Sequence, residues 1–501
     1  MHKLSLFLCT TNFKIMIKKT FFLLLISSLN SFSQTLCSSG MAGDYPCNGY
    51  DLMAHVPVSV LANTNGNPEG SDIWGWTDLT TGKEYAIAAM TNSTAFVDIT
   101  DPLNPIFLGR LDSNAGNSYW RDVKVYNNYA FIVADNVGAH GMQVFDLTRL
   151  RGLTSPQSFT SDAIYNTDNL GSCHNIIINE TNGVAYLVGC KNSSGAQLFS
   201  GGPIFVDISN PASPTKINHY SAEGYTHDAQ VVTYSGFDTD YTGKEIFIGS
   251  NEDKIVILDV TDKDNVIKIK DTGYSQIEYT HQGWFTEDQR YFIVGDEKDE
   301  QNLGIDSRTI VFDFLDLDNP VVSSTYFGPT EAIDHNGYVK GNEYFMANYK
   351  AGMRVLDISN ISASSNSMTE IGYFDTYPGS NSASFKGAWS VYPYFASGNI
   401  IINDINRGLF IVRKSGTLGI NSPTLTTSFS ISPNPMKTET TISTSDNQNI
   451  KSVQLYTVLG QKIFDKSNID QTKYVLTTSN FNKGIYILKI NATVTKKIII
   501  K

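Results

Sequence analysis

Short apolar segments recur along residues 49–414, separated by polar residues that favour turns. The segments are rich in Val, Ile, Tyr and Phe, and the breaks are rich in Asn, Asp, Gly and Pro. This alternation is typical of β-strands joined by tight turns, and no long helical periodicity interrupts it. The pattern therefore predicts an all-β protein.

A histidine precedes four of these segments at a nearly constant interval. His174, His227, His281 and His335 follow one another at spacings of 53, 54 and 54 residues. A repeat of this length indicates an architecture of equivalent units, and each interval becomes one unit. Continuing the interval in both directions gives seven units, with three further positions at Thr77, Arg121 and Ser390.

An acidic residue closes an apolar strand in six of the units and is followed by turn-forming residues. These six residues are Asp98, Asp146, Asp207, Asp259, Asp313 and Asp357. We expect each carboxylate to accept backbone N–H groups of its own turn, in preference to binding a metal. The seventh position, in LFIVRK (409–414), lacks the acid.

Each unit holds about four strands, which is typical of one blade of a β-propeller. The sequence therefore predicts a seven-bladed β-propeller over residues 49–414. The last unit has only three evident strands. We expect a strand within residues 49–61 to complete it and to join the two ends of the ring.

The chain continues beyond the repeats. Residues 415–428 are small and polar and are interpreted as a linker. Alternating apolar and polar positions over residues 429–501 predict a small β-sandwich.

The N-terminal end has the features of an export signal. From Met16, two lysines precede an apolar run and then small residues, so residues 1–33 are interpreted as an upstream extension plus a signal peptide. A retained membrane anchor is the alternative, but the apolar run is too short to span a bilayer. Residues 34–48 are then the N-terminal segment of the mature chain.

Four cysteines lie outside the predicted signal, as expected for disulfides in an exported chain. The segment CHNIIINETNGVAYLVGC is a predicted hairpin whose centre places Cys173 opposite Cys190. Cys37 and Cys47 would form the second bridge. Buried free thiols are the alternative.

Two stretches resemble known families. ISPNP, VQLYTVLGQKI, FNKGIYILKI and the terminal KKIIIK resemble the C-terminal sorting domain of the type IX secretion system of Bacteroidota. The resemblance implies handling by that secretion machinery, passage through the periplasm, and release or attachment at the cell surface. It also implies that the tail is cleaved after export.

The repeats resemble a second family. TAFVDITDPLNP, WRDVKVYNNYAFIVAD, YTHDAQVV and YTHQGWFTEDQRYFIVGDEKDE resemble the choice-of-anchor B family, built on LVIVD-type propeller repeats. This resemblance implies an exported propeller and supplies no reaction or substrate.

First strands line the channel of a propeller, so the four histidines should face a common axial space. One hypothesis is a hydrogen-bonded polar collar. The other is a divalent transition metal held by His174, His227, His281 and His335, with Asp228 as a further ligand. The candidate ligand-binding residues at the channel are Arg121, Asp122, Asp228, Gln282, Trp76 and Trp389.

Two acidic stretches, SNED (250–253) and GDEKDE (295–300), could line a cation-binding rim, but we favour solvated loops. The net charge of −12 disfavours a nucleic-acid partner. We find none of the common hydrolase, nucleotide or dinucleotide motifs.

The sequence therefore predicts an exported binding module that recognises a peptide, a glycan or a small ligand at the channel mouth. The alternatives are a metal-dependent hydrolase or lyase that uses the histidines, and a structural surface scaffold.

Overall fold

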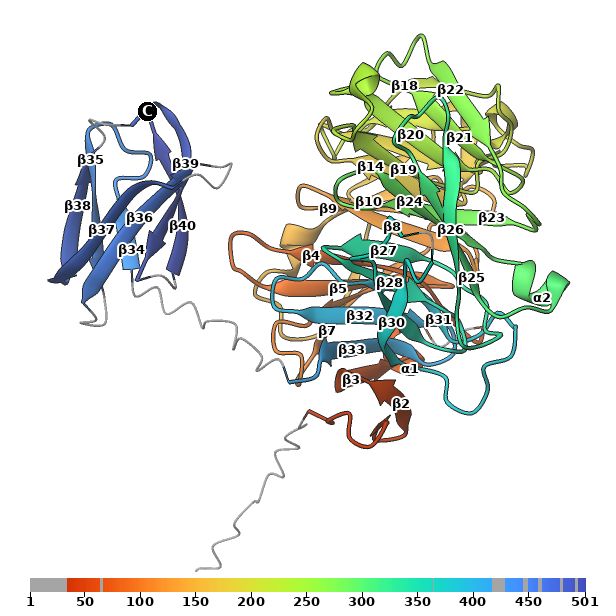
Figure 1. Ribbon diagram of the computed structural model, residues 1–501, viewed down its shortest axis with the longest axis horizontal. Coiled ribbons are helices and arrows are strands. Elements are labelled where there is room, and N and C mark those ends of the chain that lie inside the picture. The colour runs from red at the N-terminus through yellow and green to blue at the C-terminus, as the bar shows by residue number, and fades with distance from the viewer. Residues whose placement is uncertain are drawn as a thin grey trace, which may run out of the picture.

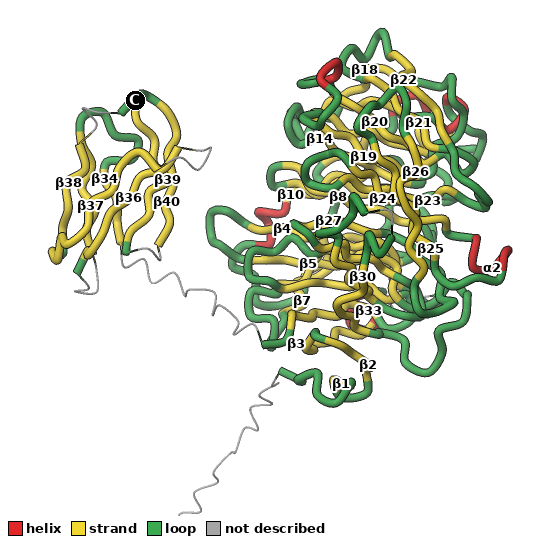
Figure 2. Tube along the Cα trace, in the orientation of Figure 1, coloured by secondary structure: helices red, strands yellow, loops and turns green. Residues whose placement is uncertain are grey.

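The computed structural model describes residues 34–63, 66–363, 365–416, 429–444, 449–457, 462–477, 481–491 and 494–501. Strands make up most of this chain, and the helices are short (Figure 2). The α-helices are α1 (Val58–Leu61) and α2 (Asp299–Leu303). The predicted signal peptide and most of the predicted linker lie outside the described residues.

The first three blades are antiparallel sheets of four strands each, and a short parallel strand extends the first. Their strands are β4 (Gly70–Thr77), β5 (Glu84–Met90), β6 (Ser93–Asp98), β7 (Ile106–Asp112) with β11 (Gln157–Phe159); β8 (Arg121–Tyr126), β9 (Tyr129–Ala134), β10 (Met142–Asp146), β12 (Ala163–Tyr165); and β14 (Asn175–Asn179), β15 (Val184–Val188), β17 (Ile204–Asp207), β18 (Thr215–His219). A two-stranded sheet of β13 (Leu170–Ser172) and β16 (Lys191–Asn192) lies beside the third.

The next three blades repeat the four-stranded plan. Their strands are β19 (Asp228–Thr233), β20 (Glu245–Ser250), β21 (Ile255–Asp259), β22 (Ile267–Thr272); β23 (Thr280–Phe285), β24 (Tyr291–Asp296), β25 (Arg308–Asp313), β26 (Val321–Phe327); and β27 (Gly337–Lys340), β28 (Glu343–Ala347), β29 (Met353–Asp357), β30 (Thr369–Phe374). The sixth sheet is widened by β1 (Met41–Ala42) and β2 (Tyr45–Asn48).

The seventh blade joins the two ends of the ring. β31 (Ala388–Tyr392), β32 (Asn399–Asp404) and β33 (Gly408–Lys414) come from the end of the propeller, and β3 (Tyr50–Pro57) comes from its beginning. β3 pairs antiparallel with β33, from Tyr50 opposite Lys414 to Pro57 opposite Gly408. The red β3 accordingly lies beside the blue β33 (Figure 1). The predicted closing strand is therefore confirmed.

The six acidic residues at the ends of third strands stabilise turns, as expected. Each carboxylate accepts the backbone N–H of the residue two positions later, at 2.8–3.0 Å. The carboxylate thus provides a hydrogen-bond partner for a turn N–H group that lies beyond the last hydrogen bond of the sheet. Its recurrence reflects the recurring turn.

Apolar side chains fill the space between adjacent blades. One buried cluster joins the first two blades and includes Tyr85, Phe96, Val123 and Phe145. The rings of Phe96 and Phe145 stack with centroids 4.5 Å apart. Every residue of β5 is buried, because second strands have neighbours in their own sheet and a blade on each face.

Two disulfides are present, Cys37–Cys47 and Cys173–Cys190. The β14–β15 hairpin pairs Asn175 with Val188 and Asn179 with Val184. This register, continued by two residues, sets Cys173 opposite Cys190, as the sequence predicts.

The C-terminal strands form two further sheets. One contains β34 (Phe429–Ser432), β35 (Glu439–Thr444) and β38 (Lys473–Thr477); the other contains β36 (Ile450–Thr457), β37 (Lys462–Gln471), β39 (Gly484–Ile490) and β40 (Val494–Ile500). They share a buried apolar cluster that includes Ile442, Val453 and Leu488, which is the core of a small β-sandwich. Among the described residues, no helix has the length and apolar character needed to cross a bilayer.

We predict that removing the closing strand destabilises the whole propeller. A chain that begins at Asn63 loses the buried side chains of Tyr50, Met53, Val56 and Leu61. At about 1.5–3 kcal/mol for each buried side chain, this loss is comparable with the stability of a typical domain, about 5–15 kcal/mol. Thermal unfolding followed by tryptophan fluorescence measures it. A control chain that ends at Lys414 keeps the parent propeller transition, and equal midpoints for the two truncations would contradict the closure.

We also predict that the Cys173→Ala/Cys190→Ala variant unfolds more easily than the parent. The bridge spans 17 residues of sequence, and a loop of that size is worth about 3 kcal/mol of chain entropy in the unfolded state. Urea unfolding under oxidising conditions gives the difference. It disappears when both proteins are reduced, because neither then has a bridge to lose.

Candidate functional site

The first strands of the blades converge on a narrow polar neck in the channel. The neck encloses only about 20 Å³ and is lined by residues that include Asp72, Asp122, Asn175 and Asn336. It separates two wider spaces, of about 650 and 490 Å³. The larger contains all four predicted histidines, and we call it the histidine funnel. The other is called the opposite funnel.

The four histidines lie side by side along the base of the histidine funnel. Successive ring centroids are 4.1, 4.5 and 4.2 Å apart in the order His174, His227, His281 and His335. Each comes from the start of a first strand, so one histidine from each of four adjacent blades reaches the axis. The expected common axial space is therefore present.

Backbone contacts fix the orientation of two imidazoles. His335 Nδ1 lies 2.6 Å from the carbonyl oxygen of Trp389, and His227 Nδ1 lies 3.1 Å from that of His281. A carbonyl can only accept, so Nδ1 carries the proton in both rings and donates it. The lone pair is then on Nε2 when the ring is neutral.

Burial keeps these imidazoles neutral. It lowers the pKa of His335 to about 3, and it lowers the pKa values of His227 and His281 well below the usual range, where neighbouring histidines add to the effect. At neutral pH these groups therefore offer nitrogen lone pairs and carry no positive charge.

Glu297 lies against two of the histidines. Its Oε1 is 3.4 Å from His335 Nε2 and 3.9 Å from His281 Nε2, and it accepts the hydroxyl hydrogen of Tyr349 at 2.8 Å. One ligand atom from each of His281, Glu297 and His335 lies within 4.8 Å of the other two. Burial raises the pKa of the Glu297 carboxyl to about 7.

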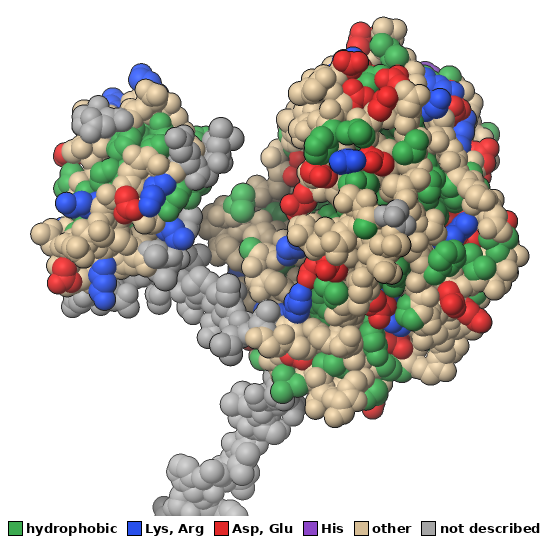
Figure 3. Space-filling view, viewed as in Figure 1, with side chains coloured by type: hydrophobic (Ala, Val, Ile, Leu, Met, Phe, Trp, Pro, Cys, Tyr) green, Lys and Arg blue, Asp and Glu red, His purple; other side chains and the backbone are tan. Residues whose placement is uncertain are grey.

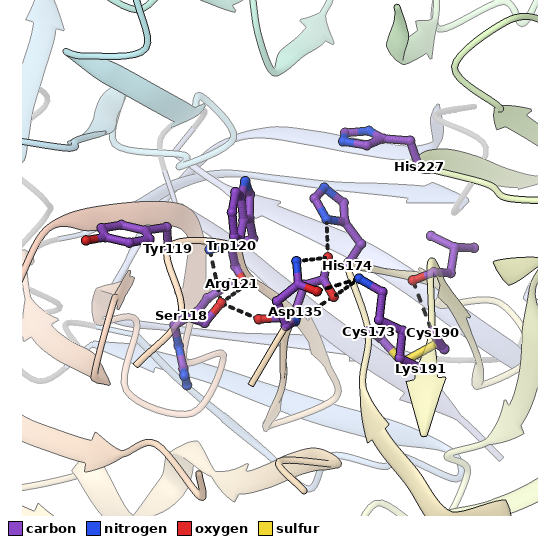
Figure 4. Close-up of polar contacts among 12 residues, drawn as sticks. Ser118, Tyr119, Trp120, Arg121, Asp135, Cys173, His174, Cys190, Lys191 and His227 are labelled. Atoms are coloured by element: carbon purple, nitrogen blue, oxygen red, sulfur yellow. Dashed lines mark hydrogen bonds and ion pairs between the residues drawn. A yellow bond between two sulfur atoms is a disulfide. The ribbon is translucent and has the colours of Figure 1, made fainter. Parts of the chain in front are cut away.

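A similar contact lies at the other end of the row. Asp135 Oδ2 is 3.1 Å from His174 Nδ1, and Lys191 Nζ is 3.1 Å from Asp135 Oδ1 (Figure 4). Burial alone would raise the pKa of Asp135, but the contacts with His174 and Lys191 leave it below its usual range. This histidine is thus held by a charged pair, unlike His281 and His335.

The structure corrects two of the predicted ring positions. Trp389, and not Ser390, takes the histidine position in the seventh blade. Its carbonyl accepts the Nδ1–H of His335, just as the carbonyl of His281 accepts the Nδ1–H of His227. In the first blade Ser71, and not Thr77, takes the same position, and its hydroxyl accepts from Arg121 N at 3.0 Å. The seventh position lies 54 residues after His335, so the interval itself leads to Trp389, and Ser390 is one residue beyond it. The first position lies 50 residues before Arg121, whereas Thr77 lies only 44 before it.

Three candidate ligand-binding residues follow a ring position and do not line the histidine funnel. Asp122 accepts the backbone N–H of Ile176 at 2.9 Å, and Gln282 accepts that of Gly337 at 2.7 Å. Asp228 and Gln282 line the opposite funnel. Successive side chains of a strand point in opposite directions, so these residues lie beneath the histidines, where Asp122 and Gln282 tie adjacent blades together.

Arg121 and Trp76 also differ from the prediction. Arg121 is 1% exposed, and its guanidinium donates to Ser113 Oγ at 2.9 Å and lies 3.3 Å from His140 Nε2. Burial lowers its pKa to about 10. Trp76 is 3% exposed and stacks on Tyr85 in the core between blades. It lies near the C-terminal end of β4, whereas the ring position Ser71 lies near the N-terminal end. Trp389 does line the histidine funnel.

The stretch 295–300 is not a solvated loop. Asp296, Asp299 and Glu300 are at most 3% exposed, and α2 holds the last two. Burial and the neighbouring Asp299 raise the pKa of Glu300 to about 9, and burial raises the pKa of nearby Asp334 well above its usual range. The expectation failed because Asp299 and Glu300 are buried in the first turn of α2, where Arg308 pairs with Asp299 and Glu300 accepts the backbone N–H of Asp334.

Sequence reasoning did not connect Glu297, Tyr349 and Asp135 with the histidines. All three lie just after a second strand, in YFIVGDE, YFMANY and YAFIVAD. In an antiparallel hairpin, the end of the second strand lies beside the start of the first. Reading the two ends together would have placed these residues at the channel.

We predict that the free energy of unfolding falls as pH rises from about 5 to 9, partly through Glu300. Its folded pKa lies above its unfolded value, so the folded state holds the proton more tightly and loses that advantage on deprotonation. The slope is on the order of 1 kcal/mol per pH unit for one such group. Glu300→Gln should flatten the fall in urea unfolding, and the exposed Glu331→Gln should not. Identical slopes in all three proteins would contradict it.

Comparison with known proteins identifies both parts of the chain. The secretion system C-terminal sorting domain matches residues 430–501, and the LVIVD repeat matches residues 118–138, 199–222 and 338–376. No curated protein matches significantly. The tail indicates export to the cell surface or secretion through the type IX machinery.

Solved structures are similar to this chain at low identity. PorZ, a surface component of the type-IX secretion system of Porphyromonas gingivalis, is 11% identical with a TM-score of 0.43, over 84% of this chain and 58% of that one. The Cps50 (Swd1) β-propeller domain of Myceliophteria thermophila is 9% identical with a TM-score of 0.44, over 71% and 99%. This chain thus spans less than two thirds of the PorZ chain. It is a type IX-sorted β-propeller protein with LVIVD repeats and a C-terminal sorting domain.

Proposed function

We propose that the protein is an exported binding module that holds the end of a carbohydrate chain in the histidine funnel. The observation that carries the proposal is the funnel itself, about 650 Å³ with aromatic side chains around a polar floor. Spaces of this size and mixed lining are typical of small-ligand sites.

Exposed rings on the funnel wall favour a sugar ligand. Tyr119, Trp120 and Phe385 are 56%, 41% and 45% exposed although they are large and apolar. Sugar rings pack their C–H faces on aromatic rings and present hydroxyls to polar groups. None of the described aromatic rings that line the opposite funnel is exposed in this way; Trp74, for example, packs on Tyr338 and Tyr392.

The charges on the wall favour a neutral ligand. Lys191 pairs with Asp135, and Lys298 lies 3.6 Å from the centre of the Tyr279 ring, whose hydroxyl donates to Glu252. Each of these lysines thus already has an acidic or an aromatic partner. Acidic and basic side chains are also interspersed over the visible face of the propeller (Figure 3). The interspersed charges and the net charge of −12 together disfavour a nucleic-acid ligand.

We predict that Trp120→Ala weakens ligand binding at least tenfold, about 1.4 kcal/mol, while the propeller stays folded. A glycan array probed with the purified protein identifies the sugar, and calorimetric titration measures its affinity. The control is Phe327→Ala on β26, which removes a similarly exposed ring outside the funnel and should leave binding unchanged. Retention of peptides in place of glycans would change the ligand class, and equal losses in both variants would contradict the site.

A second candidate function is a metal-dependent hydrolase or lyase. The cluster of His281, Glu297 and His335 at the funnel base favours it. A bound metal there would supply Lewis acidity and lower the pKa of water, next to a space that can hold a substrate. A structural surface scaffold would need neither the funnel nor the cluster.

A further inference from the structure

We propose that His281, Glu297 and His335 form a binding site for one divalent first-row transition metal at the base of the histidine funnel. This inference goes beyond ligand binding and stands separately from it, because a sugar can bind the funnel wall with or without a metal. It also narrows the predicted set of four histidines to two and adds a carboxylate.

The geometry brings two imidazole nitrogens and one carboxylate oxygen together, and each can donate an electron pair to a cation. His335 uses its Nδ1–H on the carbonyl of Trp389, which leaves Nε2 as an acceptor 3.4 Å from Glu297 Oε1. His281 Nε2 lies 3.9 Å from the same oxygen. Acceptors at such distances repel one another unless a proton or a cation lies between them.

Hydrogen bonds with surrounding groups hold two of the three proposed ligands in place, as is usual in metal sites. The Trp389 carbonyl fixes the ring of His335, and the Tyr349 hydroxyl donates to Glu297 at 2.8 Å. Such outer contacts hold first ligands in place and fix the tautomer. Both histidines are at most 4% exposed, so the cluster is built into the first strands of two adjacent blades.

The donor set selects the class of metal. Two imidazole nitrogens and one carboxylate oxygen suit Zn²⁺, Fe²⁺, Mn²⁺ or Co²⁺, whereas Ca²⁺ and Mg²⁺ prefer oxygen ligands alone. Three protein ligands leave coordination positions open, and all three residues line the histidine funnel. A ligand donor or water could then complete the coordination from the funnel side.

His174 provides a matched control within the same row. Its Nδ1 contacts Asp135 at 3.1 Å, and Asp135 also pairs with Lys191. It lies outside the group of three whose ligand atoms approach within 4.8 Å. His174→Ala therefore removes a funnel histidine but none of the proposed ligands.

The test uses the full secreted chain, stripped with a chelator and titrated with Zn²⁺ by calorimetry. Co²⁺ serves as a spectroscopic probe, because its visible absorption reports nitrogen and oxygen ligands. We expect one equivalent to bind, with affinity at least tenfold weaker in Glu297→Gln and in His335→Ala and unchanged in His174→Ala. Thermal unfolding of each variant without metal verifies that it is folded.

Two results would overturn the proposal. One is that the parent binds neither Zn²⁺ nor Co²⁺ at micromolar concentration. The other is that His174→Ala weakens binding as much as Glu297→Gln does, which would assign the metal to the whole histidine row. Glycan binding by the metal-free protein tests the proposed function on its own, so failure of one leaves the other standing.

Discussion

The antiparallel pairing of β3 with β33 is the contact that the geometry of the channel depends on. The ring of seven sheets is closed within the last sheet, where the beginning of the chain supplies the outer strand. The seam between the seventh and first blades is further held by Asn403, whose amide donates to Ser71 O at 3.0 Å, and by Glu84, which accepts from Ser397 N at 3.1 Å. Only in the closed ring do first strands from seven blades meet.

Alternation along those first strands divides structural from functional side chains. At five of the seven ring positions, those of the four histidines and Trp389, the side chain lines the histidine funnel. The residue that follows most of these positions lines the neck or the opposite funnel. Asp122 and Gln282, at such second positions, accept N–H groups from the following blade. The polar collar suggested by the sequence therefore exists, but the residues after the histidines build much of it, which leaves imidazole nitrogens available to the funnel.

The ends of the second strands supply the charge at the site. Asp135 reaches the histidine of the next blade, as Glu297 does three blades further round. The two contacts differ in what surrounds them. Asp135 has Lys191 beside it and stays ionised, whereas Glu297 has a tyrosine hydroxyl and two neutral imidazoles. This difference is why the metal proposal rests on His281 and His335 and not on His174.

Sequence alone determined the features that follow local rules. Repeats of 53 and 54 residues, the acid at each third-strand turn, the hairpin register around Cys173 and the sorting tail depend on nearby residues, and each could be read in order. Only the tertiary structure decided which side chains meet at the axis. Contacts between blades assigned the ring positions to Ser71 and Trp389, strand alternation removed Asp228 and Gln282 from the histidine funnel, and hairpin pairing brought in Glu297. Alternation and hairpin pairing are local rules, but the contacts that bring side chains of different blades together join residues about fifty positions apart. Which local features meet at the axis is therefore decided only by the folded ring.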